Sequence, residues 1–142
     1  MEELAAPLLQ RTADTNKFLR SDANAALDAM SLNMSVPRVV AVVTNKGSTH
    51  QNGVVRAVAT RLLSDIAMRI GPEKVFQLPK ETRDKFLIVG ANGLMEGSLE
   101  TRQHAKALMS TLAGHPQFQR ALMEAVPQHT MRHIAKAINS LK

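Results

Sequence analysis

His129 and His133 come closest to a metal-binding pattern in this sequence. They are four residues apart, so on a helix both imidazoles would lie on one face, as two zinc ligands do. A structural zinc site needs four protein ligands, however, and the sequence has no cysteine and only one acidic residue after position 100, Glu124. We therefore expect no metal site. The two rings would instead cover the face of a terminal helix or add positive charge to it.

Patterns typical of catalysis are also missing. Enzymes bring acids, bases or nucleophiles together in recognisable arrangements, and none is evident. The segment Gly90-Ala91-Asn92-Gly93 has neither a preceding strand nor the Gly-x-Gly-x-x-Gly spacing of a phosphate-binding loop. We expect its glycines to bend or end a helix, with Gly93 as a cap. The sequence predicts a protein that is not an enzyme and uses no cofactor.

Three short polar turns are the segments best suited to bind a partner. They precede long apolar-periodic stretches and end in an arginine, at Asp14–Arg20, His50–Arg56 and Glu96–Arg102. Asn16, Asn52 and Ser98 are residue types that cap helix N-termini, which could account for them. Lys17 is different, because a cation in the first helical turn opposes the helix dipole. Helix stability therefore does not explain Lys17. We expect Phe18 and Leu19 to anchor this turn to the core and so to fix the direction in which Lys17 points.

Apolar residues follow each of these arginines at the same distances. Three residues after each arginine comes an alanine, namely Ala23, Ala59 and Ala105, and four residues later come Leu27, Leu63 and Met109. The arginines at 20, 56 and 102 are 36 and 46 residues apart. A period near 40 made of two helices is typical of HEAT and armadillo repeats. We expect the arginines to tie one repeat to the next through carbonyls or an acid such as Asp22 or Asp65.

Helical spacing of apolar residues extends over most of the chain. It predicts helices at residues 3–13, 17–34, 37–44, 53–70, 73–77, 80–94, 98–113, 116–125 and 128–141. Five of the six prolines fall where these helices start or stop. The valine-rich run 39–43 resembles a strand, but Pro37 just ahead of it favours a short helix.

These elements predict an all-α fold, a HEAT/armadillo-like α-solenoid of stacked helix pairs, as a single domain over residues 1–142. A helix pair cannot bury its own apolar face, so the pairs must stack into one continuous core. The turn inside each pair would then lie on one edge of the stack. Lys17, His50, Asn52 and Ser98 would form a ridge along this edge, where a partner could bind.

Composition narrows the classes of partner. The chain has no Trp or Tyr and only four Phe, whereas base-stacking nucleic-acid modules need aromatic platforms. Its longest apolar runs are far too short to cross a bilayer, and its first residues, Met1-Glu2-Glu3, do not match a signal peptide. With no cysteine, the simplest expectation is a cytosolic protein without a membrane partner.

The net charge of +6 is unevenly distributed. Residues 101–142 contain six Lys or Arg, including Lys142, against one acid, a net charge of +5. Residues 37–72 contain five against one, a net charge of +4. Such patches attract acidic partners, although the C-terminal patch could equally serve solubility alone.

The first two turns resemble those of TOG domains. The resemblance rests on Asp14–Arg20 continuing through Asp22 and the stretch 25–30, and on Val54-Val55-Arg56 with 59–63. Within that family the chain looks most like the crescerin-type TOG-array regulators of axonemal microtubules. It resembles the C-terminal part of such a domain, without the early turn that bears the family's tubulin-contacting Trp.

The resemblance implies that the chain binds tubulin through turns on one edge. It carries this role to Asn16 and Lys17, and more loosely to Lys46, His50 and Asn52. It does not extend to the third turn, where Glu96 stands in place of an expected basic residue. The implied protein is a non-catalytic, monomeric tubulin- or microtubule-binding module of a cytoskeletal or ciliary regulator.

Two other functions stay open at the level of sequence. One is a helical-repeat scaffold that binds an acidic peptide or a partner helix in a groove between repeats. The other, weaker hypothesis is electrostatic binding of nucleic acid by the C-terminal charge.

Overall fold

The computed structural model describes residues 2–141, and within this range all regular structure is helical. The elements are α1 (Glu2–Arg11), α2 (Lys17–Asn33), α3 (Val36–Val43), the π-helical turn η1 (Thr44–Ser48), α4 (Gly53–Ile70), α5 (Pro72–Gln77), α6 (Lys80–Leu94), α7 (Leu99–Ala113), α8 (Phe118–Ala125) and α9 (Gln128–Asn139). The predicted all-α class is confirmed. Lys142, which the C-terminal charge patch includes, lies outside the described residues.

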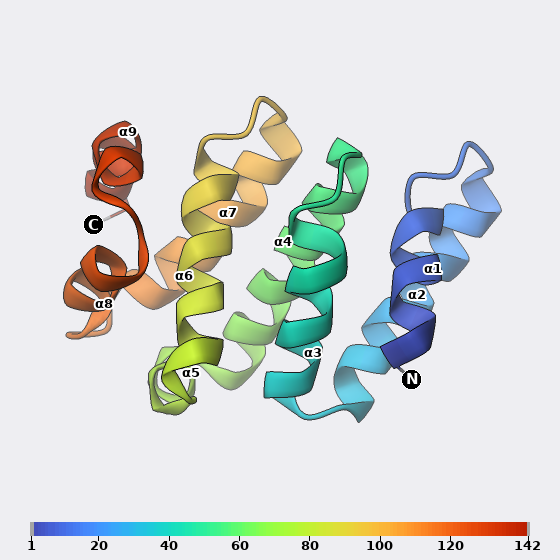
Figure 1. Ribbon diagram of the computed structural model, residues 1–142, viewed down its shortest axis with the longest axis horizontal. Coiled ribbons are helices and arrows are strands. Elements are labelled where there is room, and N and C mark those ends of the chain that lie inside the picture. Colours follow the sequence, from blue (N-terminus) through green and yellow to red (C-terminus); the bar gives the residue numbers. More distant parts are fainter. Residues whose placement is uncertain (1, 142) are drawn as a thin grey trace.

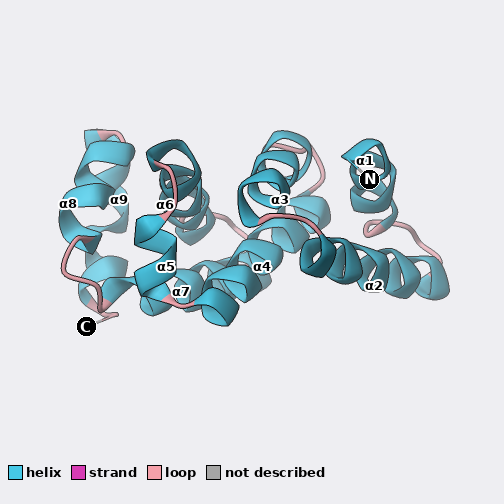
Figure 2. Cartoon of the chain, turned by 90° about the horizontal axis from the view of Figure 1, so that it is seen from below, coloured by secondary structure: helices cyan, strands magenta, loops and turns pink. Residues whose placement is uncertain are grey.

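The helices form a row of antiparallel pairs (Figure 1). Helix α1 packs on α2, α3 with η1 on α4, and α6 on α7, while the short α5 links the second pair to the third. Seen from below, α1, α3 and α6 form one layer, and α2, α4 and α7 form a second (Figure 2). Helices α8 and α9 close the row against α6. This is the predicted helical-repeat solenoid.

The repeated apolar positions build the core, as predicted. Each alanine three residues after a turn arginine is at most 3% exposed. The next apolar residue of each repeat, Leu27, Leu63 or Met109, is completely buried. Leu27, Ala59, Leu63 and Met109 belong to one continuous cluster that runs through the stacked pairs. The core therefore holds the turns in fixed positions relative to one another.

The valine-rich run is helical, as predicted, but it does not end where the sequence suggested. Val39, Val40 and Val43 are completely buried on one face of α3, and the chain then continues into η1. Inside η1, a Cβ added at Gly47 would lie 2.9 Å from the Cβ of Ala59. The π-turn thus brings backbone into close contact with α4, which only a glycine allows.

Gly93 has a different role from the one predicted. It does not cap α6, because the helix continues through Leu94 and its C-cap is Met95. Gly93 is buried, and a Cβ added there would lie 2.7 Å from the Cβ of Ala105 on α7. Absence of a side chain at this position therefore allows α6 and α7 to approach closely beneath the third turn.

Gly93→Ala is expected to lower stability, although alanine favours helix. The added methyl group would force α6 away from α7, an overpacking cost of about 1–3 kcal/mol that exceeds the gain of up to about 1 kcal/mol in helix propensity. Urea unfolding measures this change: the midpoint should fall to a lower urea concentration while the slope of the transition stays the same. Gly97→Ala is the control, because a Cβ there meets nothing within 4 Å. Equal stability of the two variants would contradict the close-packing role.

Candidate functional site

The turns inside the first three helix pairs lie at the same edge of the molecule, at the top of Figure 1. We call this the turn edge. It comprises the turns 12–16, 49–52 and 95–98, together with η1 and the first helical residues after each turn. The predicted alignment of the turns on one edge is therefore present in the structure.

Each turn is closed by its arginine in the same way. The Nη1 of Arg20 donates to the carbonyls of Asp14 and Thr15, at 2.8 and 3.1 Å. Arg56 donates to the carbonyls six and five residues before it, both at 2.8 Å, and Arg102 does so at 3.0 and 3.2 Å. The arginines are structural, as predicted, but these carbonyls belong to their own repeat and not to the next. Each guanidinium thus fixes the shape of its turn.

Asn16 and Asn52 cap the helices that follow them. The side-chain oxygen of Asn16 accepts hydrogen bonds from the amides of Phe18 and Leu19, at 2.9 and 3.3 Å. The oxygen of Asn52 accepts one from Val54 at 2.8 Å. Both side chains are exposed. The side-chain oxygens are therefore engaged in helix capping, while both residues remain accessible on the turn edge.

His50 joins the second turn to the C-terminal end of α1. Its Nδ1 accepts a hydrogen bond from the backbone amide of Asn52 at 3.0 Å, so in this state the ring proton lies on Nε2. Nε2 then donates to Oε1 of Gln10, in α1, at 2.8 Å. His50 is half-buried and has both nitrogens engaged. We conclude that His50 positions the edge and has no free ring nitrogen to offer a partner.

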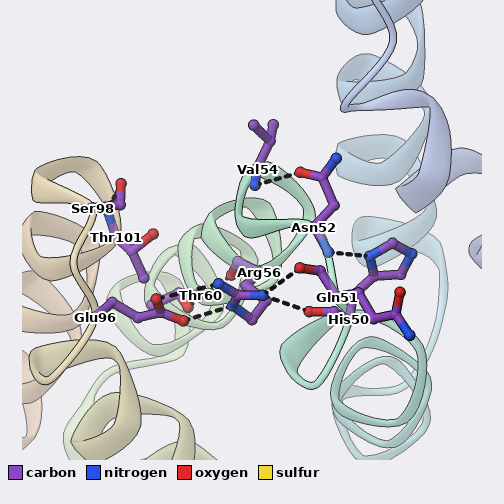
Figure 3. A network of polar contacts seen from close by, with 9 residues as sticks. All are labelled: His50, Gln51, Asn52, Val54, Arg56, Thr60, Glu96, Ser98 and Thr101. Carbon is purple, nitrogen blue, oxygen red and sulfur yellow. Dashed lines mark hydrogen bonds and ion pairs between the residues drawn. The ribbon is translucent and has the colours of Figure 1, made fainter.

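Arg56 also joins the second turn to the third (Figure 3). Its Nε lies 2.6 Å from Oε1 of Glu96, and its Nη2 lies 3.4 Å from Oε2. The hydrogen bond that Arg56 donates to the Glu96 carboxylate raises the pKa of Arg56 above its already high ordinary value. The expected link between repeats exists here, but the acid is neither Asp22, which is exposed, nor Asp65, which pairs with Arg61 at 3.0 Å.

The structural role of Glu96 was not predicted, although its position within the repeat could have indicated such a role. Asp14, His50 and Glu96 each stand six residues before the turn arginine. Asp14 and His50 each accept a hydrogen bond from the amide two residues later, and Glu96 instead holds Arg56. The carboxylate is therefore neutralised within the fold.

Lys17, at the first turn, and Lys46, beside the second, carry positive charges that form no hydrogen bond or ion pair within the described residues. Both side chains are exposed. Lys17 is the first residue of α2, and Lys46 lies in η1. Their positive charge is therefore available to a partner along the first two turns.

The expectation that Phe18 and Leu19 anchor the first turn to the core is wrong. Phe18 is 79% exposed and Leu19 is 39% exposed. Asn16 and Arg20 hold the turn instead. Exposed apolar side chains recur at the other two turns, as Val54 and Leu99. The turn edge therefore combines cations with apolar side chains that project into solvent.

The two histidines of α9 contact each other. The rings of His129 and His133 meet edge to face, with centroids 6.2 Å apart. Among the described residues, no group of three or more His, Asp or Glu side chains could hold a metal ion. No helix in the described range is long and apolar enough to cross a bilayer.

Comparison with known proteins gives a match over the whole chain. The chain is 27% identical over all of its 142 residues to TOG array regulator of axonemal microtubules protein 1 from Mus musculus. It covers 8% of the length of that relative, so the similarity concerns a small part of a long protein. No family model matches the sequence, and no solved structure matches it. The resemblance to the crescerin-type TOG-array regulators is confirmed by this match.

Proposed function

We propose that the chain is a non-catalytic module that binds microtubules or free tubulin in a cytoskeletal or ciliary setting. Support for microtubule association comes from the relative, whose name describes a regulator of axonemal microtubules. The whole length of this chain takes part in that similarity. The helical-repeat fold fits this role, because a stack of pairs presents a long, rigid edge to a protein partner.

The proposed contact surface is the part of the turn edge formed by the first two turns. The observation that carries this assignment is the presence of two exposed cations, Lys17 and Lys46, with no bond among the described residues. An acidic surface, such as that of tubulin, would be attracted to them. Phe18, Asn16 and Asn52 would add apolar contact and amide donors beside the cations.

The third turn has the opposite character and lies outside the proposed contact. Glu96 is held by Arg56, and Glu100 is exposed on the first turn of α7. An exposed carboxylate repels an acidic partner. The edge is therefore polarised along its length, and a bound partner would lie over the N-terminal half of the chain.

Lys17→Glu is expected to weaken binding to tubulin or microtubules by about five- to tenfold, a little over 1 kcal/mol. Reversal of charge would replace attraction by repulsion, whereas the unfolding free energy should change by less than about 0.5 kcal/mol. Cosedimentation with microtubules and anisotropy with free tubulin dimers would measure both affinities. The loss should shrink in high salt, because exposed charges are screened.

The matched control is Lys106→Glu on α7, which makes the same change in net charge. Lys106 is exposed and lies away from the turn edge. An equal loss in both variants would mean that only net charge matters. Unchanged binding by a folded Lys17→Glu protein would exclude the first turn as the contact.

A further inference from the structure

The terminal helix pair carries an open groove at the end of the row. Helices α8 and α9 stand at this end in both ribbon views (Figures 1 and 2). The groove between them has a volume of about 530 Å³, within the range of about 300–1,000 Å³ that is typical of ligand sites. Val126, Met131 and the exposed Met123 line it, together with Arg132. None of these residues belongs to the turn edge.

The lining of the groove is mainly apolar, and two of its residues are methionines. Here Met123 is 63% exposed, and Met131 is only partly buried beside it. Methionine side chains are flexible and polarizable, so they adapt to varied apolar partners. The lining therefore suits a protein surface that inserts apolar side chains.

The charges around the groove are positive. Arg132 lies in the lining, and Lys136 is one helical turn further along α9. Both are exposed, and no bond within the described residues engages them. The acid of this helix pair is Glu124, whose Oε1 lies 3.3 Å from Nε of Arg120. A partner with acidic groups beside its apolar side chains would therefore be complementary.

We propose that this groove binds an amphipathic helix of a partner protein, with methionine-contacting apolar residues on one face and acidic residues along the border. Helices commonly dock in this way, with apolar anchors at steps of three and four residues. A second copy of this chain is a poorer occupant, because it would set Arg132 and Lys136 against the same cations. The proposal is independent of tubulin binding, since it uses a different surface.

The test uses two designed helical peptides with the same apolar face. In one peptide the border residues are glutamate, and in the other they are lysine. The glutamate peptide should bind at least about tenfold more tightly to the chain, as measured by fluorescence anisotropy at low salt. In ¹³C-methyl NMR spectra its binding should shift the signals of Met123 and Met131, while those of Met68 and Met95 should stay in place.

Two variants with intact folding complete the test. Met123→Glu and Arg132→Glu change exposed residues, so their stability should stay within about 0.5 kcal/mol of the parent. Each should reduce the affinity for the glutamate peptide by about fivefold or more. Lys106→Glu should reduce this affinity less. Equal binding of the two peptides, or no binding of the glutamate peptide, would overturn the proposal. So would dimerisation in sedimentation equilibrium that Met123→Glu abolishes, because the occupant would then be a second copy.

Discussion

Replacing Arg56 by glutamate is expected to lower the free energy of unfolding by about 3 kcal/mol. The guanidinium donates to two turn carbonyls and pairs with Glu96 at 2.6 Å. Removal of hydrogen bonds to a charged group typically costs about 1.5–3 kcal/mol, and the new carboxylate would also face that of Glu96 in a partly shielded site. The loss would therefore exceed that of any exposed charge reversal. Urea unfolding followed by circular dichroism measures it.

A second substitution separates the two roles of Arg56. In the double variant Arg56→Glu with Glu96→Arg, the ion pair between the turns can form again with reversed polarity. The carbonyls of His50 and Gln51 would still lack their donor, so only part of the stability should return. Full recovery would show that the carbonyl bonds contribute nothing. Lys106→Glu is the control for the charge change and should unfold like the parent.

The repeat was predictable because periodic burial leaves a direct trace in sequence. Ala59 and Leu63 follow Arg56 at the same distances as Ala23 and Leu27 follow Arg20, and all four apolar residues are buried. Stacked pairs need small and large apolar residues at equivalent positions, so the spacing indicates the fold. The alignment of the turns then follows from the stacking of the pairs.

The direction of particular side chains was less predictable. Phe18, together with Leu19, was expected to anchor the first turn to the core. It lies at the first turn of α2, however, where the partner helix α1 has already ended at Arg11. The apolar stripe of α2 is covered only from Ala23 onward. Helical periodicity reports which residues share a face, but it does not report how far the neighbouring helix extends.

The pattern of the sequence also could not predict contacts between residues that are far apart in the chain. Glu96 lies 40 residues after Arg56, and the pair depends on the exact offset between adjacent repeats. The π-turn at η1 likewise depends on the approach of Gly47 to Ala59 of α4. Neither feature has a local propensity that predicts it, because tertiary packing determines both. Cap residues such as Asn16 were predictable, since capping is a local interaction.

Phe18→Ala is expected to reduce affinity for tubulin or microtubules by about 30-fold or more, if the proposed contact is correct. Aromatic side chains at the centre of protein interfaces often contribute 2 kcal/mol or more when truncated to alanine. Phe18 is 79% exposed in the free chain, so its burial against a partner would remove a large apolar area from water. For the same reason the variant should unfold like the parent.

Leu32→Ala is the matched control, because Leu32 is a 66% exposed apolar residue on the same helix. It lies 14 residues from Phe18, about 21 Å along the helix at 1.5 Å per residue, toward the opposite edge. Its truncation should leave binding unchanged. Salt separates the two contributions at the first turn, because the loss from Phe18→Ala should persist at high ionic strength while that from Lys17→Glu declines. Normal affinity of both Phe18→Ala and Lys17→Glu would place the contact elsewhere on the molecule, whereas a loss in Leu32→Ala would place it on the far end of α2.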